Sequence, residues 1–103
     1  MYILKVMMLN NMIIKKEDIK LVKEIIKKSK LFWGTSYTSD EEINLRCDSL
    51  RDTSDKLNDK YESIGSLIST ICKYYIYRTN SNYGITLKLV EETLKAFDVY
   101  FEE

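Results

Sequence analysis

The sequence predicts an all-α protein folded as an antiparallel four-helix bundle, and three observations support this class. Apolar residues recur at spacings of three and four along most of the chain, which is the period of an amphipathic helix. The 103 residues include no proline and only three glycines, which disfavours a fold built from many tight turns. With 45% hydrophobic and 31% charged residues, residues 1–103 have the composition of one globular domain.

The first helix is expected over residues 15–30, where an apolar stripe and a lysine stripe share the same period. Ile19, Val22 and Ile26 lie on the apolar side. The other side is cationic and consists of Lys16, Lys20, Lys23, Lys27 and Lys30. Gly34 is suited to end this region because glycine adopts positive φ without strain. Met12 is an alternative start, so residues 1–11 are treated as a peripheral N-terminal extension.

The second helix is expected to begin near residue 40, at the strongest boundary signal in the chain. Ser39 and Glu42 have the spacing of a capping box. In that motif the serine hydroxyl accepts a hydrogen bond from the amide three residues later, and the glutamate reaches back to the capping residue. A helix over 40–57 follows.

The apolar pattern continues from Ile43 to Tyr75 without a change of phase, so one long helix and two shorter ones both fit it. We favour two helices, 40–57 and 60–78, because a single one of nearly forty residues is long for a globular domain. Asp59 is the expected break, since it can cap the next helix and a glutamate follows three residues later.

The fourth helix is expected over residues 85–101, after a polar turn. An alternative is a short strand from Ile85 to Leu89, where apolar residues alternate, paired with residues 1–9. The helical period over fourteen residues favours the helix. The predicted core of the bundle is Ile19, Val22, Ile26, Ile43, Leu50, Leu57, Ile64, Ile68, Ile71, Leu87, Val90, Leu94 and Phe97.

Charge is divided along the chain although the total is zero. Residues 1–39 carry a net charge of +5 and residues 40–103 a net charge of −5. The lysine stripe is either a solvated helix face or a docking surface for an acidic or membrane-associated partner. It contains no arginine, the usual reader of guanine, so nucleic acid is not favoured. The acidic residues Asp48, Asp52, Asp55 and Asp59 are interpreted as an exposed salt-bridged face, not as a cation site.

Aromatic residues gather in two places. Phe32 and Trp33 follow the first helix, and three tyrosines end the third. Adjacent residues of a helix point about 100° apart, so Tyr74, Tyr75 and Tyr77 do not all face one core. Tyrosine and tryptophan are enriched in binding hot spots, and we therefore expect Phe32, Trp33, Tyr74 and Tyr77 to contribute to partner binding, unless they pack at helix ends.

The composition argues against an enzyme and against a metal or cofactor site. There is no histidine, which excludes Ser-His and Cys-His nucleophile pairs and histidine-bearing zinc sites. Cys47 and Cys72 do not form a Cys-x-x-Cys pair and are interpreted as buried structural thiols, with a disulfide between them left open. The apolar N-terminus is too short for a membrane span and lacks the features of a signal peptide, so a cytoplasmic protein is expected.

The order of hydrophobic positions and turns over residues 40–97 resembles a known family, the immunity proteins of pediocin-like (class IIa) bacteriocins, in the enterocin A immunity group. The positions that carry the resemblance are Asp40-Glu-Glu-Ile43, Leu50, Leu57, Tyr61-Glu62, Ile64, Leu67, Ile68, Ile71, Tyr74-Tyr75, Ile85-Thr-Leu87 and Leu89. The resemblance implies a four-helix, cytoplasmic, non-enzymatic protein that protects its producer by engaging a bacteriocin-bound membrane receptor complex.

Two functional hypotheses follow from the sequence. The first is a small non-enzymatic binding protein of immunity or toxin-neutralising type, which acts by protein–protein contact, with peripheral membrane association as an option. The second is a phage- or virus-encoded inhibitor or regulator that binds a host protein or nucleic-acid complex. In either case we expect Lys16, Lys20, Lys23 and Lys27 to speed encounter, and Trp33 to hold the complex.

Overall fold

The computed structural model describes residues 12–33, 39–79 and 84–103, and most of them are helical. The elements in chain order are β1 (Met12–Ile14), α2 (Lys16–Trp33), α3 (Asp40–Asn58), α4 (Ile64–Thr79), α5 (Leu87–Lys95) and β2 (Val99–Phe101). The prediction of a mostly helical protein is confirmed, while two short strands were not part of it.

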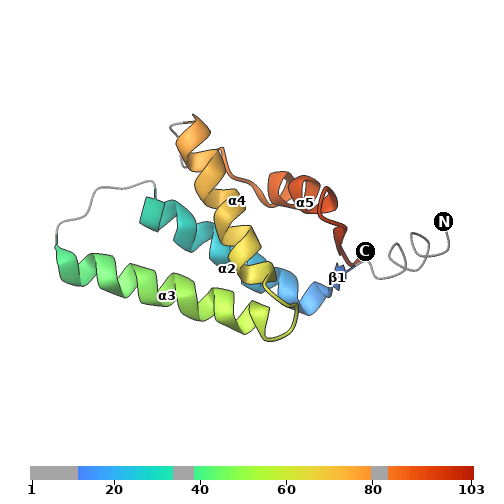
Figure 1. Ribbon diagram of the computed structural model, residues 1–103, viewed down its shortest axis with the longest axis horizontal. Coiled ribbons are helices and arrows are strands. Elements are labelled where there is room, and N and C mark those ends of the chain that lie inside the picture. The colour runs from blue at the N-terminus through green and yellow to red at the C-terminus, as the bar shows by residue number, and fades with distance from the viewer. Residues whose placement is uncertain (1–11, 34–38, 80–83) are drawn as a thin grey trace.

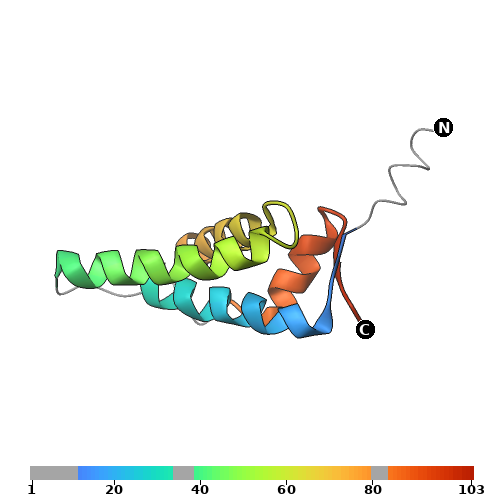
Figure 2. The ribbon, with the colours of Figure 1, turned by 90° about the horizontal axis from the view of Figure 1, so that it is seen from below.

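The three long helices pack against one another (Figure 1). Helices α2 and α3 run side by side in opposite directions, and α4 crosses the pair. The nine-residue α5 stands at the far end of the molecule, beside β1 and β2 (Figure 2). The arrangement therefore departs from the predicted antiparallel four-helix bundle, because α5 does not run along the other three helices.

Helix α2 follows the predicted amphipathic pattern but extends three residues further. Val22, Ile25 and Ile26 are buried, whereas four lysines of the opposite side are exposed and the fifth, Lys30, is half-buried. Phe32 and Trp33 belong to the last turn of the helix and not to a linker. The expected helix end at Gly34 falls outside the described residues.

The predicted start of α3 is confirmed by its capping contact. The Ser39 hydroxyl accepts a hydrogen bond from the Glu42 amide at 3.2 Å, and Asp40 is the first helical residue. The preference for two helices over one is also confirmed. The expected cap was wrong, however, because Asp59 ends α3 and α4 begins only at Ile64.

The cap of α4 comes from the preceding helix. The side-chain oxygen of Asn58 accepts from the Ser66 amide at 3.2 Å, and the Asn58 amide group donates to the Ser66 hydroxyl at 3.2 Å. Ser63 takes a positive φ of 64°, which turns the chain sharply just before Ile64. Asn58, eight residues before Ser66, therefore caps α4, whereas the sequence indicated a cap by Asp59.

The prediction of one helix over 85–101 was wrong beyond residue 95. Thr86 caps α5 by accepting from the Leu89 amide at 3.1 Å, and the helix ends at Lys95. Asp98 has a φ of 58°, a conformation that aspartate tolerates better than most residues and that ends the helical path. Phe97, expected in the core, is consequently 56% exposed.

The chain after Asp98 forms β2, which pairs in parallel with β1. Met12 lies opposite Val99, and Ile14 lies opposite Phe101. The Met12 amide donates to the Asp98 carbonyl at 3.0 Å. This small sheet joins the two ends of the described chain, and it differs in position from the alternative strand pairing of residues 85–89.

The core of the molecule follows the predicted list closely, with the exception of Phe97. Ile19, Ile43 and Leu87 are only half-buried. The other nine predicted positions are buried, namely Val22, Ile26, Leu50, Leu57, Ile64, Ile68, Ile71, Val90 and Leu94. The sheet adds Ile14 and Val99 to the buried core, at the end of the molecule where α5 lies.

Candidate functional site

The two aromatic groups of the sequence meet at one surface, where the ends of α2 and α4 lie close together. The Trp33 and Tyr77 rings have centroids 6.2 Å apart, and Phe32 packs edge-on against Trp33 at 4.2 Å. The ammonium of Lys73 lies 4.8 Å from the Trp33 ring centroid and 6.0 Å from that of Tyr77. Such cation–π contacts hold the three side chains together.

Tyr74 extends this surface along α4. Its hydroxyl accepts a hydrogen bond from the Arg78 guanidinium at 2.9 Å. Tyr74 is 54% exposed and Tyr77 is 62% exposed, and a shallow depression of about 520 Å³ lies between them, lined also by Thr70, Lys73 and Arg78. We call Phe32, Trp33, Lys73, Tyr74 and Tyr77 the aromatic surface.

Trp33 has a mixed character within the aromatic surface. Its indole ring is half-buried and packs against the core. The indole N–H is buried and finds no acceptor within the described part of the chain. Trp33 is therefore partly a packing residue, whereas Tyr74 and Tyr77 present more of their area to a partner.

The lysine stripe lies on a different face from the aromatic surface. Lys16, Lys20, Lys23 and Lys27 are all exposed along α2. Trp33 follows Lys27 by six residues, which places it about 120° away around the helix. The four lysines and Trp33, which we expected to act together in binding, therefore lie on different sides of α2.

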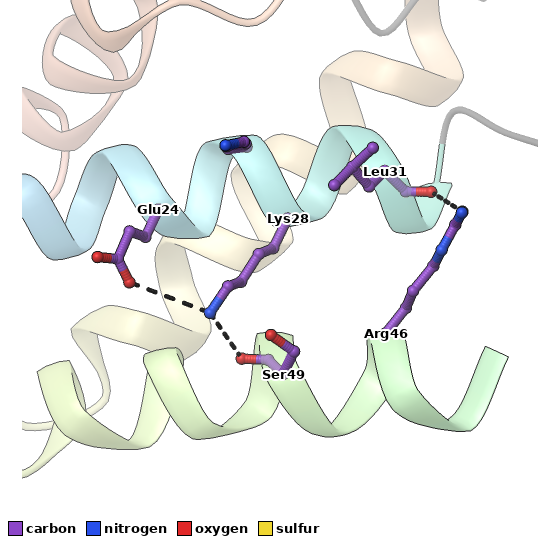
Figure 3. Close-up of a pocket in the computed structure, with 6 residues that line it drawn as sticks. Glu24, Lys28, Leu31, Arg46 and Ser49 are labelled. Carbon is purple, nitrogen blue, oxygen red and sulfur yellow. Dashed lines mark hydrogen bonds and ion pairs between the residues drawn. The ribbon is translucent and has the colours of Figure 1, made fainter. Parts of the chain in front are cut away.

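A groove of about 440 Å³ lies between α2 and α3, and sequence patterns did not reveal it. Its lining is Glu24, Lys27, Lys28, Leu31, Arg46 and Ser49. Figure 3 shows Lys28 pointing from α2 toward α3, and Arg46 pointing back to the Leu31 carbonyl, to which it donates at 2.9 Å.

The cations of this groove hold the two helices together. The Lys28 ammonium donates to the Thr53 hydroxyl at 2.6 Å and to the Ser49 carbonyl at 3.4 Å. Arg46 also forms an ion pair with Glu42, one helical turn before it. These contacts tie α2 to α3, so the groove is first of all a helix-pairing interface.

A buried carboxylate at the other end of α2 is a second feature that the sequence did not indicate. Asp18 is 3% exposed, and it accepts hydrogen bonds from the Lys60 ammonium at 2.7 Å and from the Tyr61 hydroxyl. These two hydrogen bonds lower the pKa of Asp18 below its ordinary value of 3.8, and the one from Lys60 has the larger effect. The Tyr61 hydroxyl in turn accepts from the Lys15 amide at 3.0 Å. The network fixes the α3–α4 connection onto the start of α2.

The cysteines form no disulfide. Cys47 is half-buried and Cys72 is buried, and both are free thiols. Burial raises the pKa of Cys72 to about 11, so its thiol stays protonated at neutral pH. Within residues 12–33, 39–79 and 84–103, no three His, Cys, Asp or Glu side chains come together as a metal-binding group.

Comparisons with protein families, with characterised proteins and with solved structures found no match for this chain. In the described ranges, no helix has both the length and the apolar character needed to cross a membrane. The candidate site is therefore defined by geometry alone.

Sequence reasoning identified the aromatic members of the site but not Lys73. A usable signal existed, because Lys73 precedes Tyr77 by four residues, the spacing at which helical side chains meet. The contact of Lys73 with Trp33 had no such signal, since it depends on how α2 and α4 pack.

Proposed function

We propose that the protein is a small non-enzymatic binding protein of immunity or toxin-neutralising type. It acts in the cytoplasm by protein–protein contact, and the aromatic surface is its contact region. The observation that carries this proposal is the meeting of aromatic side chains from distant segments, Trp33 from α2 and Tyr77 from α4, with the exposed Tyr74 beside Tyr77 at the shared depression.

The physical case rests on what these side chains do at interfaces. Tyrosine and tryptophan supply large, rigid area and a polar tip, and they dominate the binding energy where they become buried. Tyr74 and Tyr77 each leave more than half of their surface in water in the free protein. The Lys73 ammonium lies 6.0 Å from the Tyr77 ring centroid, and Arg78 donates to the Tyr74 hydroxyl, so both rings have a neighbour that favours their position in the free protein.

The immunity type is supported by the resemblance over residues 40–97. The segment joins two helices, α3 and α4, through a short polar connection and continues to the start of a further helix at Leu87. The proposal therefore names a bacteriocin-bound receptor complex as the partner class.

Affinity purification with matched variants tests the contact region. The tagged chain serves as bait, together with a Tyr74→Ala/Tyr77→Ala double variant and a Phe97→Ala control, which removes an equally exposed aromatic ring far from the aromatic surface. We expect a stoichiometric membrane-receptor component with the wild type and the control, and its loss with the double variant. Recovery of a soluble host enzyme or a nucleic-acid complex would favour a virus-encoded inhibitor instead.

A further inference from the structure

Two stripes of opposite charge, on neighbouring helices, share one spacing. Both advance by four, three and four residues. The basic face of α2 is Lys16, Lys20, Lys23 and Lys27, and the acidic face of α3 and its C-terminal cap is Asp48, Asp52, Asp55 and Asp59. At a rise of 1.5 Å per residue, each face extends over about 16 Å. The two faces are therefore matched in length, in number of charges and in the positions of those charges.

Both faces are open to solvent. All eight side chains are exposed. Among the described residues, the four lysines form no ion pair, and the only ion pair of the acidic face joins Asp48 to Arg51 at 3.7 Å. The expected salt-bridged acidic face is thus nearly unpaired. At these positions the positive charges of α2 and the negative charges of α3 do not neutralise each other within one copy.

We propose that the basic face of one copy docks on the acidic face of a second copy, and that two copies form a dimer in this way. Each copy carries both faces, so the surface is self-complementary, and reciprocal pairing closes the dimer. The total charge of the chain is zero, so no net repulsion opposes the approach of two copies. This contact is independent of the aromatic surface.

The proposed dimer is weak and sensitive to salt. Ion pairs between exposed side chains contribute little each, because water and salt screen them. Their effect is felt over about 10 Å at 0.1 M salt and over much shorter distances near 1 M. Association therefore occurs at low ionic strength and disappears as salt is added.

Sedimentation velocity of the full chain, at about 20 mM and about 500 mM NaCl, measures this directly. We expect concentration-dependent dimer at low salt and monomer at high salt. Lys20→Glu/Lys23→Glu and Asp52→Lys/Asp55→Lys, analysed separately, should each weaken dimerisation at least tenfold, which is about 1.4 kcal/mol. An equimolar mixture of the two double variants should form a heterodimer, because each then offers the face that the other needs.

A control separates face pairing from net charge. Lys88→Glu/Lys95→Glu changes the net charge as much as the lysine variant does, but at exposed positions of α5. It should dimerise more strongly than the lysine variant and should not form a heterodimer of equal strength with the aspartate variant. A wild-type chain that stays monomeric at low salt would overturn the proposal, as would a mixture without heterodimer. Monomer that instead sediments with anionic vesicles would assign the basic face to a membrane and would also overturn it.

Discussion

Replacing Gly65 with alanine should disrupt a close backbone contact between α3 and α4. Gly65 is the second residue of α4 and lies directly against the backbone of Ser54 in α3. A Cβ atom at this position would lie 2.2 Å from the Ser54 carbonyl oxygen and 2.8 Å from its carbonyl carbon. These neighbours are backbone atoms, which do not move aside as the end of a flexible side chain does.

The size of the effect follows from two opposing terms. Alanine is favoured over glycine in a helix by about 1 kcal/mol at most. Real Cβ atoms stay about 3.0 Å from such neighbours, so the two backbones must part by roughly 0.8 Å. A gap of this size forfeits a quarter to a half of the dispersion energy along the contact. It also strains the hydrogen bond between the Ser54 and Ser69 hydroxyls, 3.0 Å long. We expect a net loss of about 2–3 kcal/mol of unfolding free energy.

Urea denaturation followed by circular dichroism measures this loss, and thermal unfolding should show a decrease in Tm of roughly 10–15 °C. Gly84→Ala is the matched control. Its nearest heavy atom would be the Thr79 hydroxyl oxygen at 3.6 Å, an ordinary contact, so stability should change by less than about 1 kcal/mol. Equal stability of Gly65→Ala and wild type would refute the close helix crossing.

Two further predictions concern the ends of the molecule. The lowered pKa of Asp18 means that its charge stabilises the fold above the unfolded-state pKa of 3.8, and that this contribution is lost as the pH falls through the lower folded-state pKa. Asp18→Asn should therefore lower stability at pH 7 and flatten the acid limb of stability against pH; an unchanged acid limb would contradict this. Leu94→Ala should cost about 2–4 kcal/mol because Leu94 is fully buried, whereas Phe97→Ser should change stability by less than about 0.5 kcal/mol. A large loss of stability in Phe97→Ser would indicate that Phe97 is buried, as the predicted continuous helix over residues 85–101 requires.

The helices could be predicted because their signals are local. Apolar spacing located α2, α3 and α4 from residues within a few turns, and Ser39 marked the start of α3 through its own hydroxyl. The cap of α4 was not predictable in the same way. It comes from Asn58, whose side chain reaches the Ser66 amide only after the chain has turned at Ser63.

The C-terminal region could not be predicted because its structure depends on a distant partner. Helical period alone continued through Phe97 to Phe101, and these residues also suit a strand. Pairing of Val99 with Met12 decides between the two, and that contact joins opposite ends of the sequence. Asp98 was the one local hint, since aspartate tolerates positive φ.

The candidate site was predictable as two parts but not as one. Exposure of Tyr74 and Tyr77 followed from three tyrosines on one helix. The proximity of Tyr77 to Trp33 required the packing of α2 against α4, which the sequence does not encode in any short pattern. The lysines and Trp33 point to different sides of α2 because Trp33 continues the helix, whereas the sequence pattern predicts it after the helix end.

Protection of a sensitive strain is the decisive test of the proposed immunity function. The chain is expressed in a strain sensitive to pediocin-like bacteriocins, and growth is measured under challenge with a panel of them, beginning with any bacteriocin encoded beside its gene. We expect wild type and Phe97→Ala to protect against one member of the panel, and Tyr74→Ala/Tyr77→Ala to lose that protection while remaining folded. Expressed, folded wild-type protein that leaves the strain sensitive to every member would contradict the immunity function.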